Sequence, residues 1–252
     1  MLIEQTMDKL VALKLRGMIT ALQEWLDNPK RQQMKPTDLV AMLADAEWLH
    51  RENRKLTTRL RQARLRHSAC IEDIDYRHPR GLKKPLLQEL ASSRWVAHHQ
   101  SVILTGKTGT GKSYLACALG QKACRDGFGV IYKRASRLFD ELAQARADGT
   151  YLTALRRIAK ASVLILDDFG LERLGAAERR VLLDVLEDRY DVSSTVITSQ
   201  LEPDQWHAVI GDETAADSIC DRLVHNAHRI KLDGESIRKT RSPLNEDEKN
   251  SK

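Results

Sequence analysis

The sequence predicts an α/β protein: a three-layer sandwich with a five-stranded parallel sheet, preceded by a small all-helical domain. Five short apolar runs of β-type composition alternate with segments of helical periodicity, which indicates a parallel sheet with helices on both faces. A glycine-rich turn joins the first run to the helical segment behind it. The runs are Val102–Thr105, Val130–Lys133, Val163–Asp167, Val196–Ser199 and Arg229–Leu232.

The N-terminal third is expected to be helical. Apolar residues recur at helical spacing from Leu2 to Trp25, and Asn28-Pro29 ends the pattern. A second helix is expected to begin at Thr37, whose hydroxyl can cap it, and to continue toward Arg66. This segment is too polar and too short for a large core, so we expect a helical domain at residues 1–69.

Three further segments complete the expected organisation. Acidic residues, proline and glycine punctuate residues 70–84, which predicts a linker. A helix over Pro85–Ala97 then leads into an ATPase-sized α/β domain at residues 85–244. The polar, charged end of the chain, residues 245–252, is expected to be a disordered tail.

Residues 106–113 read GKTGTGKS, a complete phosphate-binding loop between a strand and a helix. Its glycines allow backbone N–H groups to curl around phosphate oxygens. Lys112 is expected to reach the β- and γ-phosphates, and the Ser113 hydroxyl to ligate Mg²⁺. A nucleoside triphosphate is therefore expected to bind at Gly106, Lys107, Thr108, Gly109, Thr110, Gly111, Lys112, Ser113 and Tyr114.

Two carboxylates follow the third apolar run, at the carboxyl end of a strand, where ligands of open α/β sheets bind. We expect Asp167 to hold Mg²⁺ and Asp168 to orient the attacking water, because phosphoryl transfer depends chiefly on positioning and charge compensation. The fourth run ends in small polar residues that can sense the γ-phosphate. Ser199 is the preferred sensor position, with Thr198 as the alternative.

The chain carries a formal net charge of +6, and basic residues gather in the segment Arg51–Arg66, where Glu52 is the one acid. Such a cluster indicates a polyanion partner, although a solvated basic helix face gives the same pattern. Arg64 and Arg66 are also compatible with docking a protein. The residues expected to contact DNA are Arg51, Arg54, Lys55, Arg59, Arg61, Arg64, Lys133 and Arg134.

Composition restricts the compartment and the class of protein. Hydrophobic residues make up 42% of the chain and charged residues 30%, and no run approaches the roughly 20 apolar residues of a membrane span. The four cysteines form no Cys-x-x-Cys pair, and the N-terminus lacks the pattern of a signal peptide. We therefore expect a cytoplasmic protein with no membrane partner.

Four segments together resemble the IstB/DnaC-like branch of the AAA+ ATPases, and within it the IstB-type helper proteins of bacterial insertion sequences. They are GKTGTGKS, VLILDDFG, TVITSQ and GDETAADSICDRLVHNAHRIKLDGESIRK. KLVALKLRGMITALQEWL and TTRLRQARLRHSACIEDIDY extend the likeness over nearly the whole chain. The resemblance implies an ATPase that uses ATP and Mg²⁺, forms a ring or helix of subunits on duplex DNA, and delivers target DNA to a transposase. It also implies a trans-acting arginine finger at Arg222 and a second sensor at Arg238.

Two departures from the wider AAA+ pattern are visible. Asp168 stands where many relatives have glutamate, which is one methylene longer, so water activation is expected to be weaker or to depend on assembly. Residues 233–252 are too few for the separate C-terminal helical lid of many AAA+ proteins, so a neighbouring subunit is expected to close the site. A helicase loader of the DnaC kind remains the alternative, and a metabolic P-loop kinase is a more distant one.

Overall fold

The computed structural model describes residues 2–28 and 34–237, and its backbone contacts divide the chain into two compact units at Thr58 and Arg59. This division falls earlier than the expected end of the helical domain at residue 69. The expected linker, residues 70–84, lies in the second unit. Within the described ranges, no helix is long and apolar enough to cross a membrane.

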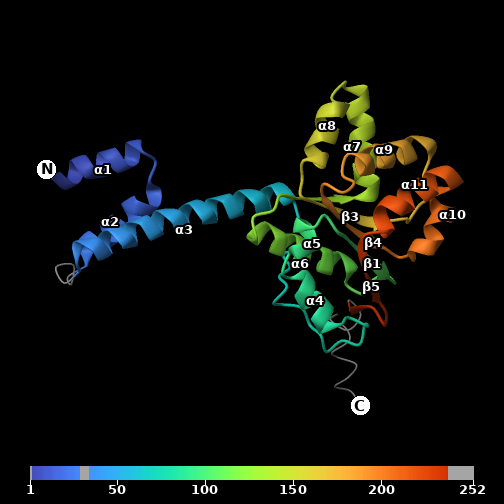
Figure 1. Ribbon diagram of the computed structural model, residues 1–252, viewed down its shortest axis with the longest axis horizontal. Helices are drawn as coiled ribbons and strands as arrows, with labels where there is room; N and C mark the ends of the chain where they lie inside the picture. Colours follow the sequence, from blue (N-terminus) through green and yellow to red (C-terminus); the bar gives the residue numbers. More distant parts are fainter. Residues whose placement is uncertain (1, 29–33, 238–252) are drawn as a thin grey trace, which may run out of the picture. The chain divides into compact units, whose positions relative to one another are not determined.

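The first unit consists of α1 (Leu2–Ala12), α2 (Arg16–Asp27) and most of α3 (Pro36–Ala63) (Figure 1). The expectation of one helix up to Asn28 is wrong, because Lys14 adopts a left-handed φ of 59° that separates α1 from α2. The expected cap at Thr37 is also wrong. Helix α3 begins one residue earlier, at Pro36, because proline suits the first turn, where its missing N–H costs nothing.

The second unit contains one parallel sheet in the order β2-β3-β4-β1-β5. This confirms the predicted five-stranded parallel sheet. Strand β4 lies between β1 and β3, so its carboxyl end is next to theirs. The strands are β1 (Ser101–Gly106), β2 (Val130–Arg134), β3 (Val163–Phe169), β4 (Ser194–Ser199) and β5 (Ala227–Leu232).

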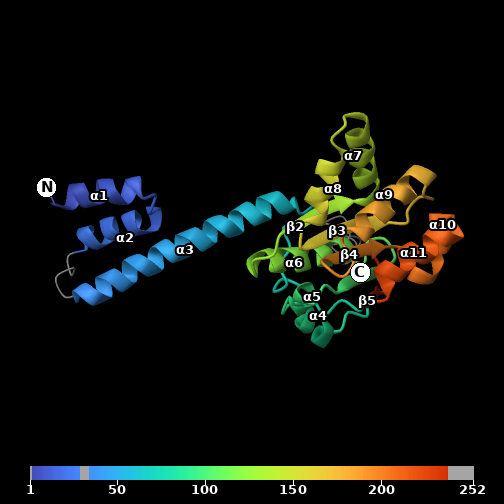
Figure 2. The ribbon, with the colours of Figure 1, turned by 45° about the horizontal axis from the view of Figure 1, so that its top comes forward.

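Helices cover both faces of the sheet, as predicted (Figures 1 and 2). Alternate residues of β3 point to opposite faces. Leu164 and Leu166 join the main core with α7, α8, α9 and α11, whereas Ile165 faces Gly120 of α6. The helices are α6 (Lys112–Arg125), α7 (Ala135–Ala147), α8 (Tyr151–Ala159), α9 (Ala176–Glu187), α10 (Trp206–Ile210) and α11 (Glu213–Val224), with a short 3₁₀ turn η2 (Pro203–Gln205).

The segment that leads into the sheet forms two short helices, α4 (Lys84–Leu90) and α5 (Arg94–Ala97), where a single helix over Pro85–Ala97 was expected. Ser93 lies between them with a left-handed φ of 54°, which a continuous helix does not permit. The described residues end at 237, five residues after β5. The expected absence of a lid and the expected tail at 245–252 concern sequence outside the described residues.

Candidate nucleotide site

The phosphate loop lies where β1 ends and α6 begins. Gly106 has a φ of 138°, and a Cβ there would lie 2.0 Å from the Leu232 carbonyl oxygen, so only glycine fits between β1 and β5. Gly111 starts α6 with a φ of 94°. The buried Lys112 ammonium donates to the carbonyl oxygens of Gly106 at 2.6 Å and Lys107 at 2.9 Å, which holds the positive charge inside the loop.

Asp167 is fully buried at the end of β3 and accepts hydrogen bonds from three other elements. Its Oδ1 accepts from the Ser113 hydroxyl at 2.8 Å and the Thr198 hydroxyl at 2.5 Å, and its Oδ2 accepts from the Tyr132 hydroxyl at 2.5 Å. Burial, and then the bond to Asp167, raise the pKa of Tyr132, which therefore stays protonated as a donor.

Ser113 and Asp167 suit a magnesium ion because Mg²⁺ takes oxygen ligands and is usually bound by one or two protein groups together with phosphates and water. Their side-chain oxygens come together from α6 and β3, 2.8 Å apart. No cluster of three or more His, Cys, Asp or Glu side chains occurs in the part of the chain that the structure describes. The donor set therefore fits a nucleotide-bound Mg²⁺ better than a self-sufficient metal site.

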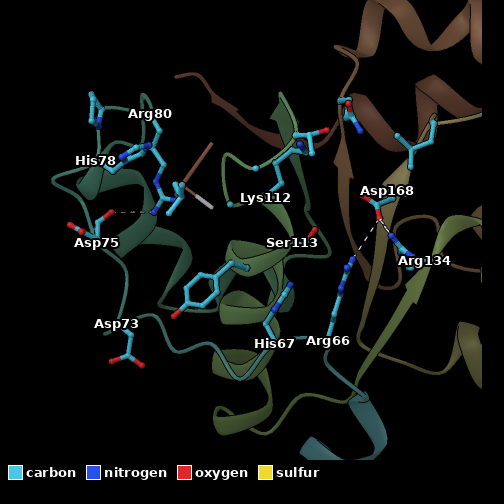
Figure 3. A pocket seen from close by; sticks show the side chains of 18 of the residues that line it. Arg66, His67, Asp73, Asp75, His78, Arg80, Lys112, Ser113, Arg134 and Asp168 are labelled. Atoms are coloured by element: carbon cyan, nitrogen blue, oxygen red, sulfur yellow. Dashed lines mark hydrogen bonds and ion pairs between the residues drawn. The ribbon is translucent and has the colours of Figure 1, made fainter. Parts of the chain in front are cut away.

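Asp168 is held by arginines (Figure 3). Its Oδ2 accepts from Arg134 Nε at 3.0 Å and Nη2 at 2.7 Å, and Arg66 Nη1 lies 3.8 Å away. Its backbone has a left-handed φ of 60°, and its N–H donates to the Thr198 hydroxyl at 2.9 Å. The hydrogen bond and charge of Asp168 raise the pKa of Arg134, so the guanidinium remains charged.

The hydroxyl beside both acids belongs to Thr198, the alternative sensor position, and not to the preferred Ser199. The Ser199 hydroxyl donates to the Phe169 carbonyl at 2.8 Å and accepts from the Leu201 N–H at 3.1 Å. An irregularity in the β3–β4 register accounts for this, because Ser199 pairs with Phe169 rather than with an acid. Gln200, which the sequence analysis did not assign, lines the pocket one residue after the strand.

A cavity of about 740 Å³ extends from the phosphate loop and is large enough for a nucleotide. One wall contains Lys112, Ser113 and Asp168, and Tyr114 also lines the cavity. The facing wall comes from the segment expected to be a linker, including Asp73, Asp75, His78 and Arg80 (Figure 3). Arg80 is buried, and its Nη1 donates to the Thr110 carbonyl at 3.1 Å, which ties this segment to the loop. The acidic residues, proline and glycine of residues 70–84 predicted a linker and did not indicate that this segment lines the cavity.

Arg222 does not reach this cavity. It lies near the end of α11, pairs with Glu187, and donates from Nη1 to the Ser218 carbonyl at 2.9 Å. It lines a separate small pocket with Ser101 and Thr195, at the amino ends of β1 and β4. The phosphate loop lies at the carboxyl ends of the strands, whereas Arg222 lies near their amino ends, on the opposite side of the sheet. Arg238 lies outside the described residues.

The basic cluster expected after the second strand is engaged with acids of the same chain. Lys133 is buried and pairs with Glu141 at 2.5 Å, and Arg134 pairs with Asp168. This differs from the expected DNA-facing surface, because β2 runs parallel to β3 and so ends beside its acids.

The three residues of the first unit that are expected to contact DNA are solvent-exposed. Arg51 pairs with Glu47 at 2.7 Å and Lys55 with Glu52 at 2.8 Å, and Arg54 is also exposed. In the second unit, Arg59 donates to the Cys124 carbonyl at 2.9 Å, while Arg61 and Arg64 are exposed.

Comparison with known proteins gives a consistent picture. The family model for IstB-like ATP binding proteins matches residues 8–244. An insertion sequence ATP-binding protein of Sinorhizobium fredii is 49% identical over 239 residues, which are 95% of this chain and 98% of the relative. A crystal structure of DnaI has a TM-score of 0.57 at 23% identity and covers 66% of this chain and 92% of its own. The crystal structure of the DnaC helicase loader has a TM-score of 0.53 at 21% identity, and it covers 65% of this chain and 97% of its own. The two solved structures share the fold.

Proposed function

Since the chain belongs to the family of IstB-like ATP binding proteins, we propose that it is an ATPase of an insertion sequence, active in transposition. In this proposal it assembles with ATP and Mg²⁺ on duplex DNA, hydrolyses the ATP, and presents the DNA to a partner transposase. The assembly consists of copies of this chain arranged in a ring or helix.

The observation that carries the ATPase proposal is the network around Asp167. Ser113, Asp167 and Thr198 converge from three elements within hydrogen-bond distance, and Lys112 lies in the adjoining loop. A magnesium ion bound by Ser113 and Asp167 would neutralise charge on the phosphates. Asp168 would orient the attacking water once its bond to Arg134 is exchanged or lengthened. Thr198 would fix the two acids relative to each other.

Self-assembly is supported by the place of Arg222. It lies at the edge of the sheet opposite the phosphate loop, so it can act on ATP only at the site of another subunit. An arginine supplied in this way stabilises the charge of the transition state. The exposed basic residues Arg54, Arg61 and Arg64 support contact with a polyanion, which would be independent of base sequence and sensitive to salt.

The alternative is a helicase loader, because the fold is shared with the DnaC helicase loader. The relatives favour the first proposal: the insertion-sequence protein of Sinorhizobium fredii covers 95% of the chain and the family model begins at residue 8, within α1, whereas the loader covers 65%. A pull-down with the full chain separates the two. Capture of the replicative helicase without the transposase would contradict our proposal.

The ATPase proposal is tested by measuring phosphate release with Mg²⁺, with and without duplex DNA, alongside electron microscopy of the same mixtures. We expect DNA to stimulate hydrolysis and ATP to be required for an assembly on the duplex. A rate of ATP consumption that is unaffected by DNA but increases when a small hydroxyl acceptor is added would indicate a kinase instead. Monomers on DNA at saturating ATP would contradict the assembly.

A further inference from the structure

Arg66 lies against both acids of the nucleotide site. Its Nη1 is 3.7 Å from Asp167 Oδ2 and 3.8 Å from Asp168 Oδ2, so one guanidinium nitrogen faces two carboxylates. Figure 3 shows Arg66 reaching toward Asp168. These distances are those of ion pairs rather than of hydrogen bonds. Two neighbouring carboxylates repel each other, and a cation between them offsets that repulsion. Arg66 therefore helps to determine how close together the two acids lie.

The residues before Arg66 are fixed to α6, the helix that carries the phosphate loop. Arg59, just before the last turn of α3, donates to the Cys124 carbonyl at 2.9 Å near the end of α6, and Ala63 is fully buried. Arg64 then ends α3 with a left-handed φ of 50°. Leu65 packs against α6, with its Cδ2 3.2 Å from the position that a Cβ on Gly120 would take.

Arg66 itself is held at the first half of α6. Burial raises the pKa of Cys117, and the backbone amides of Arg66 and His67 lie close enough to its sulfur to offset this in part. The Arg66 guanidinium thus reaches the acids from a backbone that is anchored on both sides. Arg134 differs in this respect, because it comes from a strand within the sheet.

We propose that Arg66 is a positioning residue for ATP hydrolysis, through which the last turn of α3 acts on the acid pair. The inference rests on the proposed ATPase function. In this arrangement Arg66 neutralises the Oδ2 side of Asp167 and restrains Asp168, while Oδ1 of Asp167 remains with Ser113 on the side of the metal. A displacement of the end of α3 would move Arg66 and change the spacing of the acids.

The test compares Arg66→Gln, Arg66→Lys and the wild-type full chain. For Arg66→Gln we expect kcat to fall about tenfold, because misplacement of a positioning group slows the chemical step strongly. Affinity for a fluorescent ATP analogue should stay within about twofold. The Mg²⁺ concentration that half-saturates binding of the analogue should fall about threefold, because a positive charge near the metal has been removed. Arg66→Lys should recover most of both effects.

Arg125→Gln is the matched control. Arg125 forms an ion pair with Glu72 at 2.7 Å, outside the pocket, and its side chain is 40% exposed, against 37% for Arg66. It should behave as wild type in both measurements. Arg66→Gln with an unchanged kcat, or with an unchanged Mg²⁺ midpoint, would overturn the inference. A wild-type chain that binds but does not hydrolyse ATP would contradict the proposed function, and the Mg²⁺ midpoint would still decide the role of Arg66.

The link to α3 is tested by a double-mutant cycle in the absence of DNA. Arg59→Gln removes the bond to Cys124 and should lower kcat a few-fold by loosening the last turn of α3. If Arg59 acts through Arg66, the double variant should be no slower than Arg66→Gln alone. A normal kcat for Arg59→Gln, or multiplied effects in the double variant, would refute the link.

Discussion

At the scale of single residues, Asp167 organises the site because its two oxygens accept three hydrogen bonds from three elements. Each donor comes from a different part of the chain: Ser113 from α6, Tyr132 from β2 and Thr198 from β4. A buried carboxylate is costly unless such donors satisfy it. The same bonds fix the direction of the Ser113 hydroxyl and Asp167, the two groups that suit Mg²⁺.

Lys112→Ala should weaken ATP binding about tenfold to hundredfold, because hydrogen bonds to a charged group contribute about 1.5–3 kcal/mol each. Lys112 is the loop residue whose charge lies within the curve of the loop. The measurement is titration of a fluorescent ATP analogue, with Lys122→Ala as the control, because Lys122 of α6 pairs with Asp126 and lies outside the pocket lining. Unchanged affinity in Lys112→Ala would remove this lysine from the site.

Thr198→Val and Ser199→Ala separate the two sensor candidates. The Thr198 hydroxyl donates to Asp167 and accepts from the Asp168 N–H, so valine leaves both groups without this partner at an expected loss of about 1–3 kcal/mol. We expect kcat to fall at least about tenfold in Thr198→Val. Ser199→Ala removes contacts to Phe169 and Leu201, so it should lower the melting temperature and leave kcat near the wild-type value. The reverse order of the two kcat values would restore Ser199 as the sensor.

At the scale of elements, those parts of the site that lie within one contiguous sequence motif were predictable. GKTGTGKS and the strand ending in Asp167-Asp168 have a fixed order along the chain, and their contact follows from parallel strands ending at one edge. The roles of residues 70–80 and of Arg134 depend on which elements become neighbours in the fold, which no local pattern contains. The breaks at Lys14 and Ser93 carry no signal either, because neither residue type favours a left-handed φ.

The contact between α2 and α3 requires a glycine at position 17, although helix propensity alone favours alanine there. Glu47 of α3 is buried and accepts from the Gly17 N–H at 2.8 Å and the Met18 N–H at 3.4 Å, at the start of α2. Burial opposes ionisation of this carboxyl, but the bonds from Arg51 and the two amides outweigh it and lower its pKa. The α3 carboxylate therefore serves α2 as an N-terminal cap supplied from another helix.

Gly17→Ala should destabilise the first unit even though alanine favours a helix by about 1 kcal/mol. Its Cβ would lie 2.4 Å from the Ala46 carbonyl oxygen, so α2 and α3 must separate and the bond from Gly17 to Glu47 must lengthen. Overpacking of this kind costs about 1–3 kcal/mol. Hydrogen exchange of the full chain should speed up in α2 and the first half of α3.

Gly129→Ala is the control for this substitution, because nothing lies within 4 Å of the position that its Cβ would take. It should leave hydrogen exchange in both units unchanged. Slower exchange of α2 in Gly17→Ala would mean that helix propensity outweighs the close approach of the two helices.

At the scale of the whole molecule, the phosphate loop and Arg222 lie at opposite ends of the strands of one sheet. In the proposed assembly, each subunit would therefore present a nucleotide at one end of the sheet and an arginine at the other. Contact between unlike surfaces of identical subunits is heterologous, and it generates rings or helical filaments according to whether the rotation closes. ATP bound between two subunits would then hold the assembly together, and its hydrolysis would release it.

Mixing two inactive variants tests this arrangement directly. Arg222→Ala retains an intact phosphate loop, and we expect it to bind ATP normally but to hydrolyse it at least about 10³-fold more slowly, as expected for loss of a trans-acting arginine. Lys112→Ala lacks a working loop but retains Arg222. In a mixture, an Arg222→Ala site that faces a Lys112→Ala neighbour contains both groups, so DNA-dependent hydrolysis should recover to roughly a quarter of the wild-type rate if subunits mix at random. An arginine acting within its own subunit would leave the mixture as inactive as its components.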